Sequence, residues 1–362
     1  MRPGTKWRAP AGGLLLAIAA GSVCAWLRTP LPWMIGPLFA VAIARLSGVQ
    51  VTALPWWRYA GQWIIGTALG LYFTPVVVRQ VLSLAPWMVV AGVYALCSGM
   101  ICGLALAKVA NVDRRTAFFA SVPGGATEMS ILAERFGART DLVAVAQSLR
   151  IVIVVSAIPF LFTMINVHGT DPYVQGTREF AWTGLAELLA LTALGGAALH
   201  RFRFPNGWVI GALFVSLPLT AMQIELSSLP TWLSNVAQLL IGCSLATRFQ
   251  KDFLSRAPRY LAAVTITVVL AIAMAALFGV FLGWAMSANA ATTILATAPG
   301  GIAEMAITAK VLQLGVPIVT AFHVARMVLL VSTTGVIYQF VQSWRKRRIL
   351  LRGTNGADDR SP

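Results

Sequence analysis

Long apolar stretches alternate with short polar or basic segments along almost the whole sequence. The stretches lie near residues 11–27, 31–46, 57–78, 84–107, 117–133 and 142–167, and again near residues 180–199, 208–222, 232–247, 260–286, 292–309 and 318–341. In hydrocarbon every backbone N–H and C=O must be hydrogen-bonded within the protein, and runs of this length rich in Leu, Ala, Val and Gly favour helices over a β-barrel. The pattern therefore predicts an all-α polytopic membrane protein.

The two sets of stretches are related by an internal sequence repeat. The segment Ala120-Ser-Val-Pro-Gly-Gly-Ala-Thr-Glu-Met129 returns 176 positions later as Ala296-Thr-Ala-Pro-Gly-Gly-Ile-Ala-Glu-Met305. An offset of 175 carries Trp33-Met-Ile-Gly36 onto Trp208-Val-Ile-Gly211, and the offset of 176 also aligns the pairs Gln62 and Gln238, Gly66 and Gly242, Ile131 and Ile307, and Arg150 and Arg326. A repeat of this length indicates one structural unit used twice, not a stacked solenoid.

The repeat defines the domain organisation. We predict a first membrane repeat over residues 11–167 and a second over residues 180–342, joined by a polar linker at residues 168–179. A cytoplasmic segment, residues 1–10, precedes the repeats, and a cytoplasmic tail, residues 343–362, follows them, first basic and then disordered.

Composition supports the membrane assignment. The chain is 58% hydrophobic and only 11% charged, with a mean hydropathy of +0.76, which leaves too little polar surface for a soluble globule. A net charge of +16 would suggest nucleic acid for a soluble protein. Here the basic residues lie in short loops, where they set topology and contact anionic headgroups, so we expect the lipid bilayer and no direct nucleic acid as a partner. The four cysteines lie inside apolar runs and indicate neither disulfides nor zinc.

Charge also tests how many stretches cross the membrane, because Lys and Arg in short loops favour the cytoplasm. With the N-terminus inside and all twelve stretches crossing, eleven basic residues would face outward. If the Pro-Gly-Gly stretch of each half enters and leaves on one side, the cytoplasm holds 22 of the 28 basic residues. This predicts an inverted-topology repeat with about ten spanning helices plus two broken or re-entrant segments, an architecture of many secondary transporters. The segments around Arg114 and over residues 248–259 would then be cytoplasmic, as would both termini.

The repeated Pro-Gly-Gly element is the candidate site. A proline followed by two glycines breaks a helix, so Pro123, Gly124 and Gly125 in one half and Pro299, Gly300 and Gly301 in the other should each start a new half-helix. Proline suits a first helical turn, and the free N–H groups that follow it leave a partial positive charge. In an inverted repeat the two N-termini approach each other and suit an anion.

Each half-helix has an acid in its first turn, Glu128 or Glu304. The structural interpretation is compensation of the helix dipole. The functional interpretation is a carboxylate that binds a proton or cation, because ionisable groups at membrane depth are costly and usually line a pathway.

An arginine follows each proline by 27 positions, inside the next apolar run: Arg150 and Arg326. The structural alternative is an ion pair with the glutamate of the same half, and the functional one is bidentate binding of the negative group of a substrate. Gln147 and His323 lie one turn before each arginine on the same helix face. His323 could shuttle a proton or be a hydrogen-bonded structural residue.

The two Pro-Gly-Gly-x-x-Glu-Met elements, their arginines and the duplicated Trp-x-Ile-Gly-x-Leu-Phe motif resemble the Gram-negative membrane AbrB duplication family over nearly the whole chain. Members are labelled ammonia monooxygenases, AbrB-family regulators or transport proteins. An oxygenase needs a metal or cofactor, yet the histidines at 168, 200 and 323 form no metal motif. A transcription factor needs a soluble basic module, and no polar segment is long enough to fold as one.

These observations favour a secondary transporter of the inner membrane for a small anionic solute, coupled to a proton or cation, without cofactor or metal. The alternatives are a membrane protein that affects gene expression indirectly and, less well supported, a membrane oxygenase. The sequence favours a non-enzymatic protein and leaves a homo-oligomer open.

Overall fold

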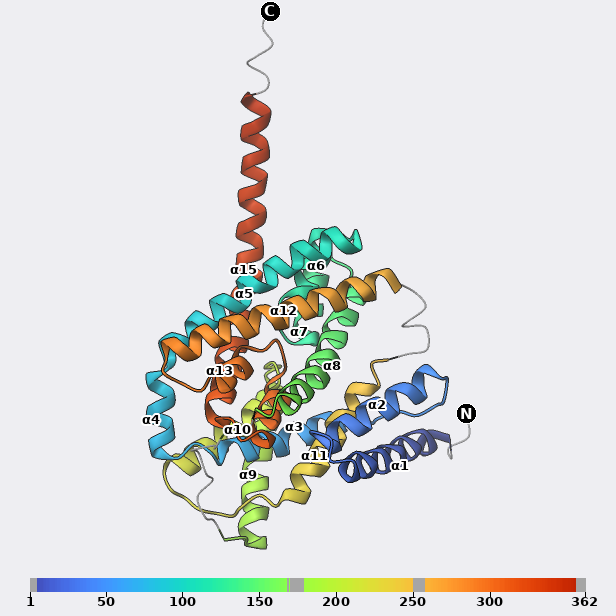
Figure 1. Cartoon of the computed structure of the whole chain (residues 1–362), viewed down its shortest axis with the longest axis vertical. Coiled ribbons are helices and arrows are strands. Elements are labelled where there is room, and N and C mark those ends of the chain that lie inside the picture. The colour runs from blue at the N-terminus through green and yellow to red at the C-terminus, as the bar shows by residue number, and fades with distance from the viewer. Residues whose placement is uncertain (1–4, 168, 170–178, 250–257, 356–362) are drawn as a thin grey trace, which may run out of the picture.

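The computed structural model describes residues 5–167, 169, 179–249 and 258–355, and this part of the chain is helical without strands (Figure 1). The linker predicted at residues 168–179 lies almost entirely outside the described residues. The helices are α1 (Thr5–Trp26), α2 (Pro32–Leu46), α3 (Pro55–Gly70), α4 (Pro75–Ser83), α5 (Ala85–Ala110), α6 (Arg114–Ser121), α7 (Ala126–Arg135), α8 (Thr140–Met164), α9 (Trp182–Arg201), α10 (Gly207–Ala221), α11 (Thr231–Ala246), α12 (Pro258–Ala285), α13 (Ala290–Thr297), α14 (Ile302–Val311) and α15 (Val316–Asn355).

Several of these helices are long and apolar enough to cross a membrane, so the prediction of an all-α polytopic membrane protein is confirmed. In the described residues there are six such helices, or up to seven if α3 and α4, which meet at 96°, form one broken span. Three further apolar helices, α2, α10 and α11, have only 15 or 16 residues. The predicted count of about ten is reached only if these three cross as well.

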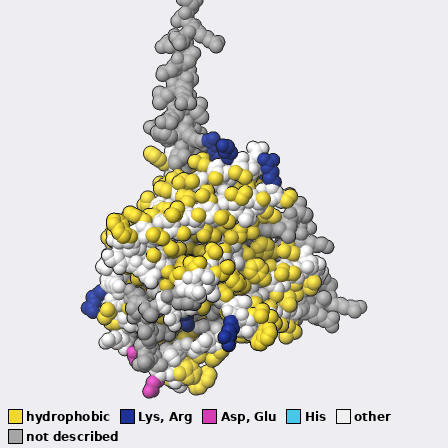
Figure 2. Space-filling model, viewed as in Figure 1, with side chains coloured by type: hydrophobic (Ala, Val, Ile, Leu, Met, Phe, Trp, Pro, Cys, Tyr) yellow, Lys and Arg dark blue, Asp and Glu magenta, His cyan; other side chains and the backbone are white. Residues whose placement is uncertain are grey.

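The surface agrees with a lipid environment. Figure 2 shows hydrophobic side chains over a broad band of one face, with few charged side chains among them. On α12 the outward residues include Leu277 at 74% and Trp284 at 79% exposure. A soluble monomer rarely exposes so wide an apolar surface.

The helices form two bundles. The first bundle contains α1, α2, α3, α9, α10 and α11, and the second contains α5, α6, α7, α8, α12, α13, α14 and α15 (Figure 1). Helices of the two sequence halves are packed against each other in the first bundle, where α3 lies on α10 and α2 on α11. Contacts between the bundles involve mainly α3 with α14 and α15. α4 belongs to neither bundle and contacts α10 of the first and α5 and α15 of the second.

The repeated sequence motifs make matching contacts in both halves. Gly36 of α2 packs on the backbone of Ala20, and Gly211 of α10 packs on that of Gly195, so closely that a methyl group on either glycine would collide with a carbonyl oxygen. Gly66 lies equally close to Val209, and its neighbour Gln62 bonds to Asn206. The Gln-x-x-x-Gly motif of the first half therefore combines close helix packing with a hydrogen bond between α3 and the N-cap of α10.

The ends of α6, α8, α11 and α12 that are rich in basic residues lie together. The backbone N–H of Arg139 donates to Thr116 Oγ1 at 2.9 Å, and the Tyr260 hydroxyl donates to the Leu142 carbonyl at 3.0 Å. Arg45 Nε donates to the carbonyl of Phe249 at 2.9 Å, which joins the end of α2 to the residues after α11. These segments therefore share one face of the molecule. Its assignment to the cytoplasm, like the inverted topology, stays a prediction.

The final helix runs further than the predicted second repeat. α15 continues to Asn355, past residue 342 and into the segment assigned to the tail. The added residues include Arg, Lys and Leu, which favour helix, and no glycine or proline interrupts them before Gly353. In Figure 1 this part of α15 extends out of the body as a single rod.

A candidate anion site between two broken helices

Both Pro-Gly-Gly elements break a helix, as predicted. α6 ends at Ser121 and α7 begins at Ala126, while α13 ends at Thr297 and α14 begins at Ile302. The prolines were expected in the first turn of the new helices, but each lies two positions before the N-cap glycine. The reason is that these glycines, Gly125 and Gly301, are extended, with ψ of 142° and 162°, so helical backbone starts only after them.

Within each Pro-Gly-Gly-x-x-Glu-Met motif, the glycines pack against the side chains of the glutamate and the methionine. A methyl group on Gly124 would lie 2.5 Å from Met129 Cε, and one on Gly300 would lie 2.6 Å from Met305 Cγ. In the same way the carboxylates of Glu128 and Glu304 fold back over Gly125 and Gly301, where a Cβ would overlap Oε2. A carboxylate at this third helical position compensates the positive end of its helix. The spacing Pro-Gly-Gly-x-x-Glu-Met is therefore explained by local packing.

The Gly301→Ala substitution is expected to displace the Glu304 carboxylate and to impair function strongly. The overlap with Oε2 forces either the acid or the backbone to move, although alanine alone would tolerate the local φ and ψ. Gly335→Ala is the matched control, because its added methyl group would meet only Leu132 Cδ2 at 3.7 Å. Solute uptake and thermal unfolding of both variants test this; equal behaviour of the two would show that the Glu304 position does not matter.

The two arginines bind the helix breaks themselves. Arg150 donates from Nη1 to the Val122 carbonyl and from Nη2 to the Gly124 carbonyl, both at 3.1 Å. Arg326 donates in the same way to the carbonyls of Ala298 and Gly300. Among these four described side chains, no ion pair joins Arg150 or Arg326 to Glu128 or Glu304. Each arginine thus neutralises the negative C-terminal end of α6 or α13, while the positive N-terminus of α7 or α14 has its own glutamate, Glu128 or Glu304, folded over it.

Each arginine also retains an unused donor. Arg150 and Arg326 are 5% exposed, and the Nε atom of each is buried without a hydrogen-bond partner. A buried donor without a partner is costly, by about 1–3 kcal/mol in typical cases. Each helix break is therefore bound by an arginine that keeps one buried donor unpaired.

Gln147 and His323 support the breaks from matching positions. Gln147 Nε2 donates to the carbonyls of Phe119 and Val122, each at 2.9 Å. His323 Nε2 lies 2.9 Å from the carbonyl oxygen of Leu295, and its Nδ1 lies 2.9 Å from Arg326 Nη2. Because a guanidinium only donates, Nδ1 accepts and the ring proton is on Nε2. Both nitrogens are occupied, so the geometry favours the structural interpretation of His323, which holds Arg326 in place.

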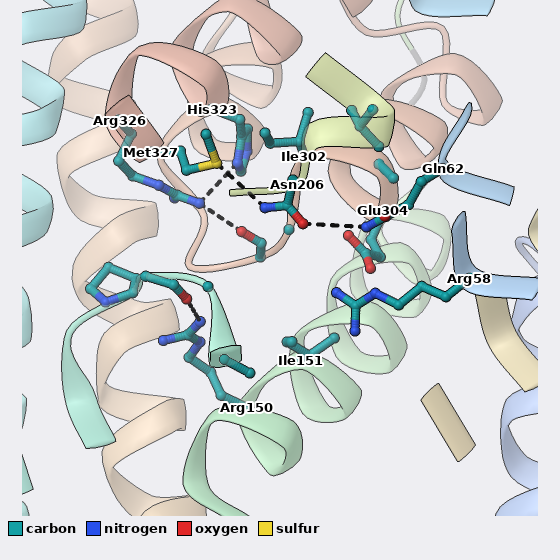
Figure 3. A pocket seen from close by; sticks show the side chains of 18 residues that line it. Arg58, Gln62, Arg150, Ile151, Asn206, Ile302, Glu304, His323, Arg326 and Met327 are labelled. Carbon is teal, nitrogen blue, oxygen red and sulfur yellow. Dashed lines mark hydrogen bonds between the residues drawn. The ribbon is translucent and has the colours of Figure 1, made fainter. Parts of the chain in front are cut away.

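A cavity of about 50 Å³ lies between the two breaks, at the junction of the bundles (Figure 3). It brings together most of the predicted site residues, but Pro299 and Glu128 do not line it. Its walls are Arg58, Gln62, Pro123, Gly124, Gly125, Ala126, Arg150, Ile151, Asn206, Val209, Gly300, Gly301, Ile302, Ala303, Glu304, His323, Arg326 and Met327. Three arginines and one carboxylate give this lining a formal excess of two positive charges, which suits a small anion.

A wider space, here called the vestibule, adjoins the cavity. It measures about 760 Å³ and shares Arg58, Gln62, Gly125, Ala126 and Asn206 with the cavity. Its other lining residues are Tyr59, Thr127, Glu128, Ile131, His200, Arg201, Arg203, Phe204, Gly207 and Trp208. The two acids of the repeated motif therefore differ in place, since Glu304 lines the inner cavity and Glu128 the vestibule.

Three polar residues of the cavity come from the first bundle and were not predicted as site residues. Arg58 and Gln62 lie on α3, and Asn206 is the N-cap of α10. Gln62 Nε2 donates to Asn206 Oδ1 at 3.2 Å, and Asn206 Nδ2 lies 3.4 Å from Met327 Sδ. A possible sequence signal was Arg58 itself, an arginine one turn before a glutamine in an apolar run. Only the packing of the bundles shows that it faces the breaks.

A further arginine lies near the start of α7, where it lines a pocket together with Ala126 and Thr127. Arg248, after α11, donates from Nη1 to Ser148 Oγ at 3.1 Å. Desolvation lowers the pKa of this guanidinium to about 10, so it remains charged at neutral pH. It adds to the positive potential around the first helix break.

The comparison with protein families identifies the chain. The family model described as transition state regulatory protein AbrB matches residues 33–342, which include both helix breaks and both arginines that bind them. The chain belongs to the AbrB family. The AbrB family resemblance predicted from the duplicated motifs is thereby confirmed.

Two curated relatives match most of their own length. The chain is 25% identical over 362 aligned residues to "Uncharacterized protein YhjN" of Bacillus subtilis (strain 168), covering 91% of this chain and 90% of the relative. It is also 25% identical over 321 residues to "Putative regulator AbrB" of Escherichia coli (strain K12), covering 88% of this chain and 92% of the relative. Within the described part of this AbrB-family chain, no three His, Cys, Asp or Glu residues are grouped so that they could hold a metal ion, and His168 falls outside that part.

Proposed function

We propose that this AbrB-family protein is a secondary transporter of a small anion, with a proton or cation as the coupling ion. The observation that supports this most directly is the cavity at which two half-helix N-termini meet two buried arginines that have no carboxylate partner. Helix N-termini in broken membrane helices are suited to anionic groups of a substrate. Glu304 is buried in the same cavity, and its carboxylate is the candidate group that binds the coupling proton or cation.

The surroundings of the two half-helices support alternating access. Equivalent positions differ widely: Ile131 of α7 is 60% exposed, whereas Ile307 of α14 is 3% exposed. In α7 only Met129 and Ala133 are buried, while every residue from Ile302 to Ala309 in α14 is buried. In a duplicated fold the halves can exchange environments. We therefore expect a second state in which α14 is open and α7 is closed, with the second bundle moving against the first.

The matched pair Ile131→Cys and Ile307→Cys tests this directly. Each is made in a chain whose native cysteines at 24, 97, 102 and 243 are replaced. Cys at 131 should react quickly with a membrane-impermeant maleimide from the side of the vestibule. Cys at 307 should react only from the opposite side, more slowly, and at a rate that changes with an imposed pH gradient. Protection of position 307 from both sides under every gradient would contradict a carrier with two accessible states.

Uptake into proteoliposomes tests the transport activity itself. Radiolabelled acetate, succinate, methanesulfonate and benzenesulfonate form a starting panel of anions, measured with and without a pH gradient. We expect at least one anion of the panel to be taken up saturably, and we expect the pH gradient to drive this uptake. A metabolite-accumulation screen of a deletion strain would identify the natural solute.

A second candidate function is a membrane sensor that affects gene expression through a partner. The names of the family and of the Escherichia coli relative, both of which refer to regulation, favour this alternative. Such a sensor would bind the anion and change conformation without uptake. Anion binding combined with zero uptake of the natural solute would therefore favour it over the carrier.

A further inference from the structure

An aromatic cluster lines the vestibule beside Arg58. The rings of Tyr59 and His200 lie 4.8 Å apart, and those of Tyr59 and Trp208 lie 6.2 Å apart at an angle of 24°. His200 and Trp208 complete the cluster at 5.9 Å. The three residues come from α3, the end of α9 and the start of α10, and Tyr59 is 37% exposed. The vestibule therefore has an aromatic wall next to a cation.

Comparison of the two sequence repeats shows which of the three aromatic residues is part of the helix packing common to both halves. Trp208 packs on Gly196, where an added methyl group would lie 2.7 Å from the indole, and its counterpart Trp33 packs on Gly21 at 2.8 Å. The tryptophan is thus part of the repeated packing. By the same offsets, however, Tyr59 corresponds to Asn235 and His200 to Ala25. The repeated packing needs neither of these rings, so the full cluster belongs to the vestibule alone.

The sizes of the two spaces separate the parts of a ligand. The inner cavity, at about 50 Å³, accepts a carboxylate or sulfonate group, whereas a site for benzene needs roughly 150 Å³. The vestibule, at about 760 Å³, has room for a ring. Arg58 lines both spaces and can bind the negative group at their junction.

We infer that the site selects planar aromatic anions, with the negative group between Arg58 and the helix breaks and the ring against Tyr59, His200 and Trp208. This inference rests on the proposed anion transport and specifies its substrate class. Aromatic rings stack favourably with one another. The Arg58 guanidinium attracts the negative group of the ligand, which a neutral aromatic compound lacks. Both features are needed for selection.

Calorimetric titration of the full-length protein in detergent tests the selection with three probes. Benzenesulfonate carries both the ring and the charge, methanesulfonate has the charge alone, and benzenesulfonamide has the ring alone. We expect benzenesulfonate to bind at least about tenfold more tightly than methanesulfonate, and benzenesulfonamide to give no measurable binding. The sulfonates are permanently charged, so leakage across the bilayer does not obscure a parallel uptake assay.

Three variants locate the selection within the structure. Tyr59→Leu and Trp208→Leu should reduce the preference for benzenesulfonate to within about threefold while methanesulfonate affinity stays the same. Trp33→Leu is the matched control, since it removes the equivalent packing residue, which does not line the vestibule, and it should keep the full preference. Equal loss of preference in the Trp33 and Trp208 variants would overturn the inference, because the effect would then come from the repeated packing.

The outcomes separate this inference from the proposed function. Equal affinities for the two sulfonates, together with gradient-driven uptake of methanesulfonate, would overturn the aromatic selection and leave anion transport standing. Preferential binding of benzenesulfonate without uptake of any anion would support the aromatic site and count against transport. Absence of binding by both sulfonates would overturn the aromatic site.

Discussion

The Arg326→Met substitution is expected to lower both the stability and the activity of the protein more than any other single change in the site. Arg326 supplies donors to the carbonyls of Ala298 and Gly300, and a methionine supplies none. Each carbonyl left unsatisfied in the protein interior costs about 1–3 kcal/mol, so the free energy of unfolding should fall by several kcal/mol. Thermal unfolding in detergent and anion uptake measure the two effects.

Arg326→Lys separates the structural role from binding. An ammonium group can still reach one carbonyl, so stability should recover in part. It cannot reproduce the planar, two-point contact of the guanidinium, so anion binding should remain impaired. Full recovery of both properties would show that only the positive charge matters at this position.

The double variant Glu304→Gln with Arg326→Met should be no more stable than Arg326→Met alone. A structural ion pair between the two residues would predict rescue, because removing both charges avoids a buried unpaired one. The structure instead gives Arg326 backbone partners, and neutralising Glu304 does not satisfy those carbonyls. Restored stability in the double variant would instead support an ion pair between Glu304 and Arg326.

Glu304→Gln is expected to abolish uptake while the protein remains folded. The amide has nearly the shape of the carboxylate, but it can neither bind a cation strongly nor exchange a proton, so coupling should be lost. Glu128→Gln is the matched variant, since it changes the equivalent residue, which lines the wider vestibule, and it should retain measurable uptake. Uptake at several imposed pH gradients distinguishes the two. Equal uptake by both variants would contradict a special role for Glu304.

The helix breaks could be predicted from the sequence because their causes are local. Proline and paired glycines disrupt a helix wherever they occur, and the repeat showed that two such breaks belong together. The partners of Arg150 and Arg326 could not be predicted in this way. Opposite charge suggested the glutamates as partners, whereas backbone carbonyls at the ends of α6 and α13 have no signature in the sequence.

The contribution of the first bundle was also beyond sequence reasoning. Arg58 and Asn206 reach the cavity because α3 of one half packs on α10 of the other, an arrangement that depends on tertiary contacts at Gly66. The glycines gave a signal for close packing but did not identify the partner helix. Single arginines in apolar runs, examined together with the glycine positions, offer the best route to such residues.

Because α15 is long, it connects the candidate site to a point well outside the body of the protein. The helix that contains His323 and Arg326 continues to Asn355, and at 1.5 Å per residue its end is roughly 44 Å beyond Arg326. A helix of this kind is stiff, so a tilt of about 10° at the arginine would move its tip by about 8 Å. If occupancy of the small buried cavity tilted α15 in this way, the displacement of its tip would be large enough for another macromolecule to detect.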